Sequence, residues 1–226
     1  MTIKRVKEII DDLSNKEQLG YLSGAEFNNL FRISELSHFN FLLGNPTQYS
    51  PGRPVPRVGL GMTKAIDERL APFRVTIEYN IFGDDSKFDK PVDLVAIEAI
   101  NGDDGTPICP VTHAALGRLL KSSVWDLREN PVYCDYDTYI QVFHPDLSDA
   151  SFGFITITGI TTPPESIWAY TVDGDIETYS PTGSIDPWWL DSDIYRIIGI
   201  MCKHVGIKLQ DGVLMQSGQS IINQGE

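Results

Sequence analysis

The sequence is poor in cysteine and has no long apolar run. Its 226 residues include only three cysteines, Cys109, Cys134 and Cys202. An odd number at wide spacing favours free thiols over a disulfide framework, so we expect a reducing compartment. The first residues, MTIKRVKEIIDDL, are charged at nearly every turn, so they predict no signal peptide. No uncharged stretch approaches the length of a transmembrane helix, about 18 residues. We therefore expect cytoplasmic synthesis and no membrane partner.

Positive charge is also scarce. The chain has 18 Lys and Arg against 31 Asp and Glu, which gives a net charge of −13. The average surface of such a chain repels phosphate. The positive charges near the beginning are too sparse for a basic groove: Lys4, Arg5, Lys7, Arg53 and Arg57. Sequence-specific binding of nucleic acid is therefore disfavoured.

No stretch carries a complete catalytic or ligand-binding motif. Gly59 to Lys64 has glycines, Thr and Lys, but the order and spacing are wrong for a phosphate loop. The acidic turns at 84–85, 103–104 and 173–175 lack the ligand pattern of an EF-hand, so we interpret them as solvated. The histidines are scattered over separate elements: His38, His113, His144 and His204. The sequence thus disfavours an enzyme and predicts no cofactor and no metal.

The segment MCKHV places Cys202 and His204 two residues apart, which raises the question of a metal or catalytic pair. On a helix these side chains lie about 200° apart, so they cannot grip one ion. We interpret Cys202 as a small core residue and His204 as a residue near a helix end.

Two helices open the chain. Apolar residues recur at spacings of three and four from Thr2 to about Lys16, which predicts an amphipathic helix. Ser23 and Glu26 form a capping box before a second helical run, which ends at Gly44. This second run carries phenylalanine on more than one side. The main body or a neighbouring subunit must therefore cover the surplus.

A segment rich in proline and glycine follows, GNPTQYSPGRPVPRVGLG. It predicts an extended arm over 45–62, because proline and glycine disfavour regular structure there. The arm either docks on a neighbouring molecule or serves as a flexible tether.

The rest of the pattern predicts an α+β fold with a mainly antiparallel β-body. We expect short helices at Thr63 to Leu70 and Val111 to Leu120. Alternating or β-branched runs predict strands at 73–79, 92–100, 132–136, 139–143, 152–160 and 166–171. A helix from Asp193 to Gly206 and a final helix from Gly212 to Gln219 close the chain. The predicted parts are a helical hairpin at 1–44, the arm at 45–62, the β-body at 63–190 and a C-terminal helix pair at 191–226. The N-terminal and C-terminal helices are expected to share one domain.

Large aromatic side chains mark the candidate functional surface. Trp188 and Trp189 follow Pro187 in a loop, where they either cover the core or anchor an interface. The candidate subunit-interface residues are Phe31, Phe39, Phe41, Pro46, Tyr49, Pro51, Pro54, Pro56, Trp188 and Trp189.

The order of several short segments, over nearly the whole chain, is similar to a family of small virion structural proteins. These proteins form rings in the neck and tail of crAss-like phages and related phages of Bacteroidetes hosts. The segments that carry the resemblance are Val6 to Ile10, Asn15 to Asn28, Ile66 to Phe73, Lys90 to Leu94, Asp191 to Leu209 and Gln216 to Gln224. The longer sheet region around Phe152 to Tyr170 departs from the family pattern.

The resemblance implies a non-enzymatic protein that forms a closed ring of copies, with twelve-fold symmetry, between the portal and the tail. Its partners would be its own copies, the portal and other neck or tail proteins, and its location would be the virion. An acidic lumen would let genome DNA pass without sequence-specific binding. The alternative is a soluble module whose β-body and tryptophan loops bind a carbohydrate or a peptide.

Overall fold

The structure is a computed structural model that describes residues 1–15, 22–44, 66–80, 87–122, 126–127, 130–144, 154–174, 176–208, 216 and 219–220. It has an α+β fold, as the sequence predicts. The chain divides into two compact units. Unit 1 combines Met1–Pro72 with Pro163–Glu226, and unit 2 is Phe73–Thr162.

This division differs from the predicted one in two segments. Residues 66–72 and 163–190 were expected in the β-body, but they belong to unit 1 with the helices. For residues 163–190, part of the reason is polar anchoring. Arg32 donates to the carbonyl of Pro163 over 2.9 Å, and the Trp168 amide donates to Asn28 over 2.9 Å. The N-terminal and C-terminal helices share this unit.

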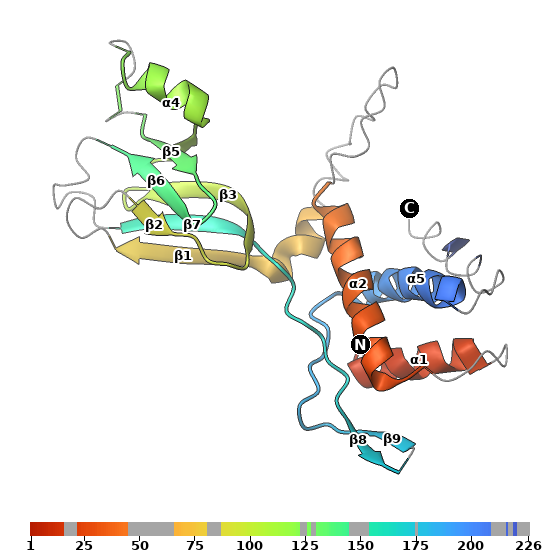
Figure 1. Ribbon diagram of the computed structural model, residues 1–226. Coiled ribbons are helices and arrows are strands. Elements are labelled where there is room, and N and C mark those ends of the chain that lie inside the picture. Colours follow the sequence, from red (N-terminus) through yellow and green to blue (C-terminus); the bar gives the residue numbers. More distant parts are fainter. Residues whose placement is uncertain are drawn as a thin grey trace, which may run out of the picture. The chain divides into compact units, whose positions relative to one another are not determined.

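Three helices form the main part of unit 1 (Figure 1): α1 (Ile3–Asn15), α2 (Gly24–Leu42) and α5 (Asp191–Lys208). On α1, the apolar residues Ile3, Val6 and Ile10 are buried, and the helix contacts α5. The apolar residues that recur at spacings of three and four therefore face the core, as an amphipathic helix requires.

The predicted capping box of α2 is confirmed. The Ser23 hydroxyl accepts from the Glu26 amide, and the Glu26 carboxylate accepts from the Ser23 amide. After the helix, Gly44 has a φ of 75°, which glycine adopts without steric strain. The α2 helix packs against α5, in which the side chains of Ile194, Ile197 and Met201 are buried. Residues 66–70 are also helical, within the helix predicted from Thr63.

The α5 helix begins at Asp191, two residues before the predicted start, so Asp193 lies in its first turn. Most of the predicted helix from Gly212 to Gln219 lies outside the described residues. Within the described part of the chain, no helix is long and apolar enough to span a membrane.

Unit 2 contains an antiparallel sheet with strand order β1-β7-β3. Its strands are β1 (Arg74–Asn80), β7 (Phe154–Thr161) and β3 (Leu94–Gly102). At Gly159 in the central strand, a Cβ atom would lie 2.5 Å from the carbonyl oxygen of Ala96. Only glycine allows this close approach, which lies beside the irregular register of β3.

A second sheet has the order β2-β6-β5-β4. Its strands are β2 (Lys87–Asp89), β6 (Tyr139–Phe143), β5 (Val132–Asp135) and β4 (Cys109–Pro110), and the α4 helix (His113–Leu119) follows β4. The two shortest strands, β2 and β4, were not predicted. The β4 strand pairs parallel to β5, and the other ladders of the described chain are antiparallel.

One core joins the two sheets of unit 2. Its buried members are Phe88, Leu94, Ile100, Ile108, Tyr133, Ile140, Val142, Ile155 and Ile157. The predicted strand at 166–171 is only partly correct. Tyr170 and Thr171 begin β8 (Tyr170–Asp173), which pairs with β9 (Ile176–Tyr179) as a separate hairpin in unit 1.

Candidate subunit interface

The structure divides the predicted interface residues into three groups. Phe31, Phe39 and Trp189 are 0%, 2% and 4% exposed. For these three the prediction is wrong in the folded chain, because the chain covers them itself. Phe31 stacks on Phe27, whose ring in turn meets the edge of Trp168.

Two of the predicted residues lie at the surface of unit 1. Phe41 is 45% exposed and Trp188 is 60% exposed. The remaining residues lie outside the described part of the chain, so they stay a prediction: Pro46, Tyr49, Pro51, Pro54 and Pro56.

The tryptophan pair has two separate roles. The Trp189 ring packs 5.1 Å from the His38 ring and 6.4 Å from the Phe39 ring, measured between centroids. Trp189 therefore covers the core, whereas its neighbour Trp188 faces solvent.

Further apolar side chains are exposed near these residues in the sequence. On α2, Ile33 is 52% exposed, eight residues before Phe41. Leu190 and Tyr195 are 49% and 54% exposed, just before and at the start of α5. We call Ile33, Phe41, Trp188, Leu190 and Tyr195 the outer set. Exposed apolar side chains of this kind are available for contact with another protein.

A buried carboxyl group holds residues 163–166 against α2. The Ser166 hydroxyl donates to Glu35 over 2.7 Å, and the Arg32 guanidinium lies 3.6 Å from the other carboxyl oxygen. Burial raises the pKa of Glu35 above its usual value, although Ser166 and Arg32 act in the opposite direction. The charged form of Glu35 is therefore incompletely compensated.

A second buried polar contact joins α2 to α5. His38 Nε2 lies 3.2 Å from Asp193 Oδ1, and both side chains are almost fully buried. Arg69, in the helical residues 66–70, approaches the same oxygen within 3.6 Å. The sequence pattern did not predict these two polar contacts. Their signal was the position of Glu35 and His38 on the helix face of Phe31, Phe39 and Leu42.

A groove of about 320 Å³ opens between the last turns of α2 and the middle of α5. Phe41 and Ile200 supply apolar walls, and Arg196, Lys203 and His204 add nitrogen groups. The Arg196 guanidinium lies 4.2 Å from the centre of the Phe41 ring, a cation–π arrangement. The described lining includes no carboxylate. The groove is therefore both apolar and positive.

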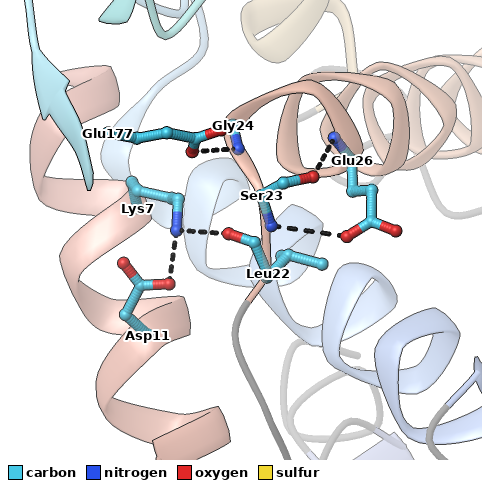
Figure 2. A network of polar contacts seen from close by, with 7 residues as sticks. All are labelled: Lys7, Asp11, Leu22, Ser23, Gly24, Glu26 and Glu177. Carbon is cyan, nitrogen blue, oxygen red and sulfur yellow. Dashed lines mark hydrogen bonds and ion pairs between the residues drawn. The ribbon is translucent and has the colours of Figure 1, made fainter. Parts of the chain in front are cut away.

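At the opposite end of α2, a polar network holds the β8–β9 hairpin (Figure 2). The Gly24 amide donates to Glu177 of β9 over 2.7 Å. Lys7 of α1 donates to Asp11 over 2.5 Å and to the Leu22 carbonyl over 3.0 Å. These bonds join α1, the beginning of α2 and the β9 strand of the hairpin.

The close approach at this junction requires a glycine. A Cβ atom at Gly24 would lie 2.6 Å from the Tyr170 ring and 2.7 Å from the Trp168 ring. Beside Glu177, the side chains next to the turn of the hairpin are exposed. Val172 and Ile176 are 63% and 70% exposed, beside the exposed carboxylate of Asp173. We call Val172, Asp173 and Ile176 the hairpin tip.

Unit 2 has an open groove of its own, of about 660 Å³. Val95, Ile97, His113, Tyr133 and Asp135 are among its lining residues. Beside it lies a row of ring contacts, in which Tyr136 stacks 4.3 Å from Tyr139 and meets His113 at 4.3 Å. Apolar walls with a few polar groups are typical of ligand-binding grooves.

The described residues contain no group of three potential metal ligands. Cys202 is 2% exposed, as expected for a small core residue. Its burial raises the pKa of the thiol to about 11. His204 instead lines the α2–α5 groove, so the two side chains have separate surroundings.

Comparison with protein-family models and with curated proteins finds no match for this chain.

Proposed function

We propose that this protein is a structural protein of a phage virion, in which copies of the chain form a closed ring in the neck or tail. The observation that carries the proposal is the outer set on unit 1. Five large apolar side chains are exposed there, although the helices beneath them have a well-covered core. Contact with another protein would remove this apolar area from water.

The exposed tryptophan of the outer set is suited to a durable contact. Binding energy at interfaces is concentrated in a few large side chains, with tryptophan prominent among them. Trp188 is 60% exposed, next to Trp189, whose ring packs against His38 and Phe39. The family resemblance supports a ring of identical copies as the form of this contact.

The charge of the chain supports a place on the path of the genome. With a net charge of −13, a ring of such chains would repel the phosphates of DNA on average. Genome DNA would then pass without binding to a particular sequence. The portal and other neck or tail proteins would be the further partners, and the virion the location.

The test is assembly. We expect purified protein, alone or with the portal and neighbouring virion proteins, to form particles of one discrete mass in sedimentation and mass photometry. Mass spectrometry of purified virions should detect the chain, and electron microscopy should place it in a ring. A chain that stays monomeric at high concentration with these proteins present contradicts the proposal.

Matched variants connect assembly to the outer set. Trp188→Ala with Phe41→Ser should weaken assembly, because both changes remove exposed apolar area without touching the core. Lys87→Ala with Leu120→Ser changes unit 2 instead and serves as the control. If both double variants assemble like the parent, the outer set is not the interface.

The second candidate is a module that binds a carbohydrate or a peptide, favoured by the groove of unit 2 and its tyrosine stack. Such a protein would remain monomeric and show saturable binding to a glycan or peptide. Titration followed by heteronuclear NMR would place the shifts at His113, Tyr133 and Tyr136. Discrete assemblies without such shifts would exclude this function.

A further inference from the structure

Two exposed features lie at opposite ends of α2. Glu177 of the β8–β9 hairpin accepts from the Gly24 amide in the first turn, and the α2–α5 groove includes Phe41 in the last turn. Seventeen residues separate Gly24 from Phe41, which corresponds to about 26 Å along a helix. In Figure 1 the hairpin extends beyond α1, away from the end of α2.

The two features are chemically complementary. The groove combines Phe41 and Ile200 with Arg196 and Lys203. The hairpin tip combines two exposed aliphatic side chains with the carboxylate of Asp173. Opposite charges of this kind steer association and fix its register, whereas the apolar side chains supply affinity.

The strand register of the hairpin suits insertion between two walls. Val172 pairs with Glu177, and Asp173 pairs with Ile176. Because successive side chains of a strand alternate between faces, Val172 and Ile176 lie on opposite faces of the hairpin. Val172 shares its face with Glu177, which is bonded to Gly24 of the same chain, whereas Ile176 shares the opposite face with Asp173. The tip therefore offers Ile176 and Asp173 together on one face and Val172 on the other. The groove, of about 320 Å³, lies within the size range of protein binding pockets.

We propose that the hairpin tip of one copy docks in the α2–α5 groove of the next copy. This inference rests on the proposed function and names the contact that joins the ring. Since tip and groove are different surfaces, the contact is heterologous, and repetition closes a ring when the rotation permits. A two-stranded hairpin also gains stability from such a partner, because an isolated hairpin is only marginally stable in water.

Charge-reversal substitutions on the two surfaces test the contact. Lys203→Glu or Asp173→Lys alone should weaken assembly by about tenfold, because each places like charges together. The double variant, Lys203→Glu with Asp173→Lys, should recover much of the loss. Circular dichroism should show the parent fold for all three, because both side chains are outside the core. Recovery supports the contact, and additive losses or no losses overturn it.

Disulfide trapping tests the same contact by distance. In a Cys109→Ser background, Val172→Cys with Ser37→Cys should give a ladder of linked chains under mild oxidation. Ser37 is exposed and lines the groove. Val172→Cys with Glu8→Cys is the matched control and should give no ladder beyond a dimer. A ladder specific to the Ser37 pair supports the docking.

The two proposals fail in different ways. If the parent chain assembles but no specific ladder forms and the charge variants assemble normally, the docking is wrong while the ring remains. If the parent chain stays monomeric with its virion partners, both proposals are wrong.

Discussion

The two units differ in what they bury. Unit 2 has a core of aliphatic and aromatic side chains, and the described chain places no buried charged residue there. Unit 1 holds every buried polar or charged side chain of the described residues: Lys7, Ser34, Glu35, His38, Ser166, Asp193 and Arg196. One unit thus relies on apolar packing, and the other adds polar pairs.

The difference follows the course of the chain. Unit 2 is one continuous segment of the sequence. Unit 1 is assembled from two segments, one before and one after unit 2 in the sequence. The polar pairs of unit 1 join these segments, as in His38 with Asp193 and Glu35 with Ser166, separated by 155 and 131 residues. Apolar helix faces tolerate sliding, but a buried hydrogen bond is costly to break. We interpret the pairs as the contacts that set the helix register in unit 1.

The largest expected effect is the loss of stability when a core side chain is truncated, which should differ between the two units in the transition that it lowers. Phe31→Ala should cost unit 1 about 3–5 kcal/mol, and Ile157→Ala should cost unit 2 about 2–5 kcal/mol, because each opens a cavity. Differential scanning calorimetry should resolve two transitions, with each variant lowering a different one.

Conservative variants provide the control for this comparison. Ile157→Val should lower the same transition by only about 0.5–1.5 kcal/mol, because less volume is lost. A single transition that both alanine variants lower equally would show that the units unfold as one.

A smaller effect is expected for the polar contact between α2 and α5. Asp193→Ala should destabilise the protein by about 1–3 kcal/mol, because it leaves His38 buried without this acceptor. Urea unfolding measures the loss. Asp191→Ala is the matched control two residues earlier, where the side chain is 69% exposed, and it should leave stability nearly unchanged. Equal losses in the two variants would mean that burial of the Asp193 contact has no special role.

The smallest effect concerns pH. Because burial raises the pKa of Glu35, the folded state holds its proton more tightly than the unfolded state. The contribution of Glu35 to stability is therefore complete below its unfolded pKa and is lost as pH rises through the folded pKa. Glu35→Gln should accordingly gain stability relative to the parent as pH rises from 4 to 8.

Urea unfolding at several pH values checks this expectation. Glu8→Gln, on the exposed side of α1, controls for the loss of one carboxylate at the surface. A loss of stability of Glu35→Gln relative to the parent as pH rises would show that pairing with Arg32 outweighs the burial of the charge.

Local patterns predicted most of the secondary structure. The capping box at Ser23, the glycine after α2 and the strand at Tyr139–Phe143 are signals within a few neighbouring residues, and each appears where predicted. The short strands β2, β4 and β9 were missed, because four residues or fewer carry no clear period. Residues 163–190 were placed in the wrong unit because side-chain bonds to α2, not their own pattern, decide where they pack.

The candidate interface was predicted less well. Phe31, Phe39 and Phe41 are alike as residue types, and so are Trp188 and Trp189. In the structure, each set is divided between the core and the surface. Periodicity locates a face of α2, but it does not say which face another part of the chain will cover.

Neighbouring residues and composition were enough to predict the helices, the longer strands and the acidic charge. Which aromatic rings are buried and which are exposed depends instead on how distant segments pack. The same packing brings Glu35 to Ser166 and His38 to Asp193, and it places a groove and a hairpin tip at opposite ends of one helix. No local pattern predicts these contacts, because they join residues more than a hundred positions apart in the chain.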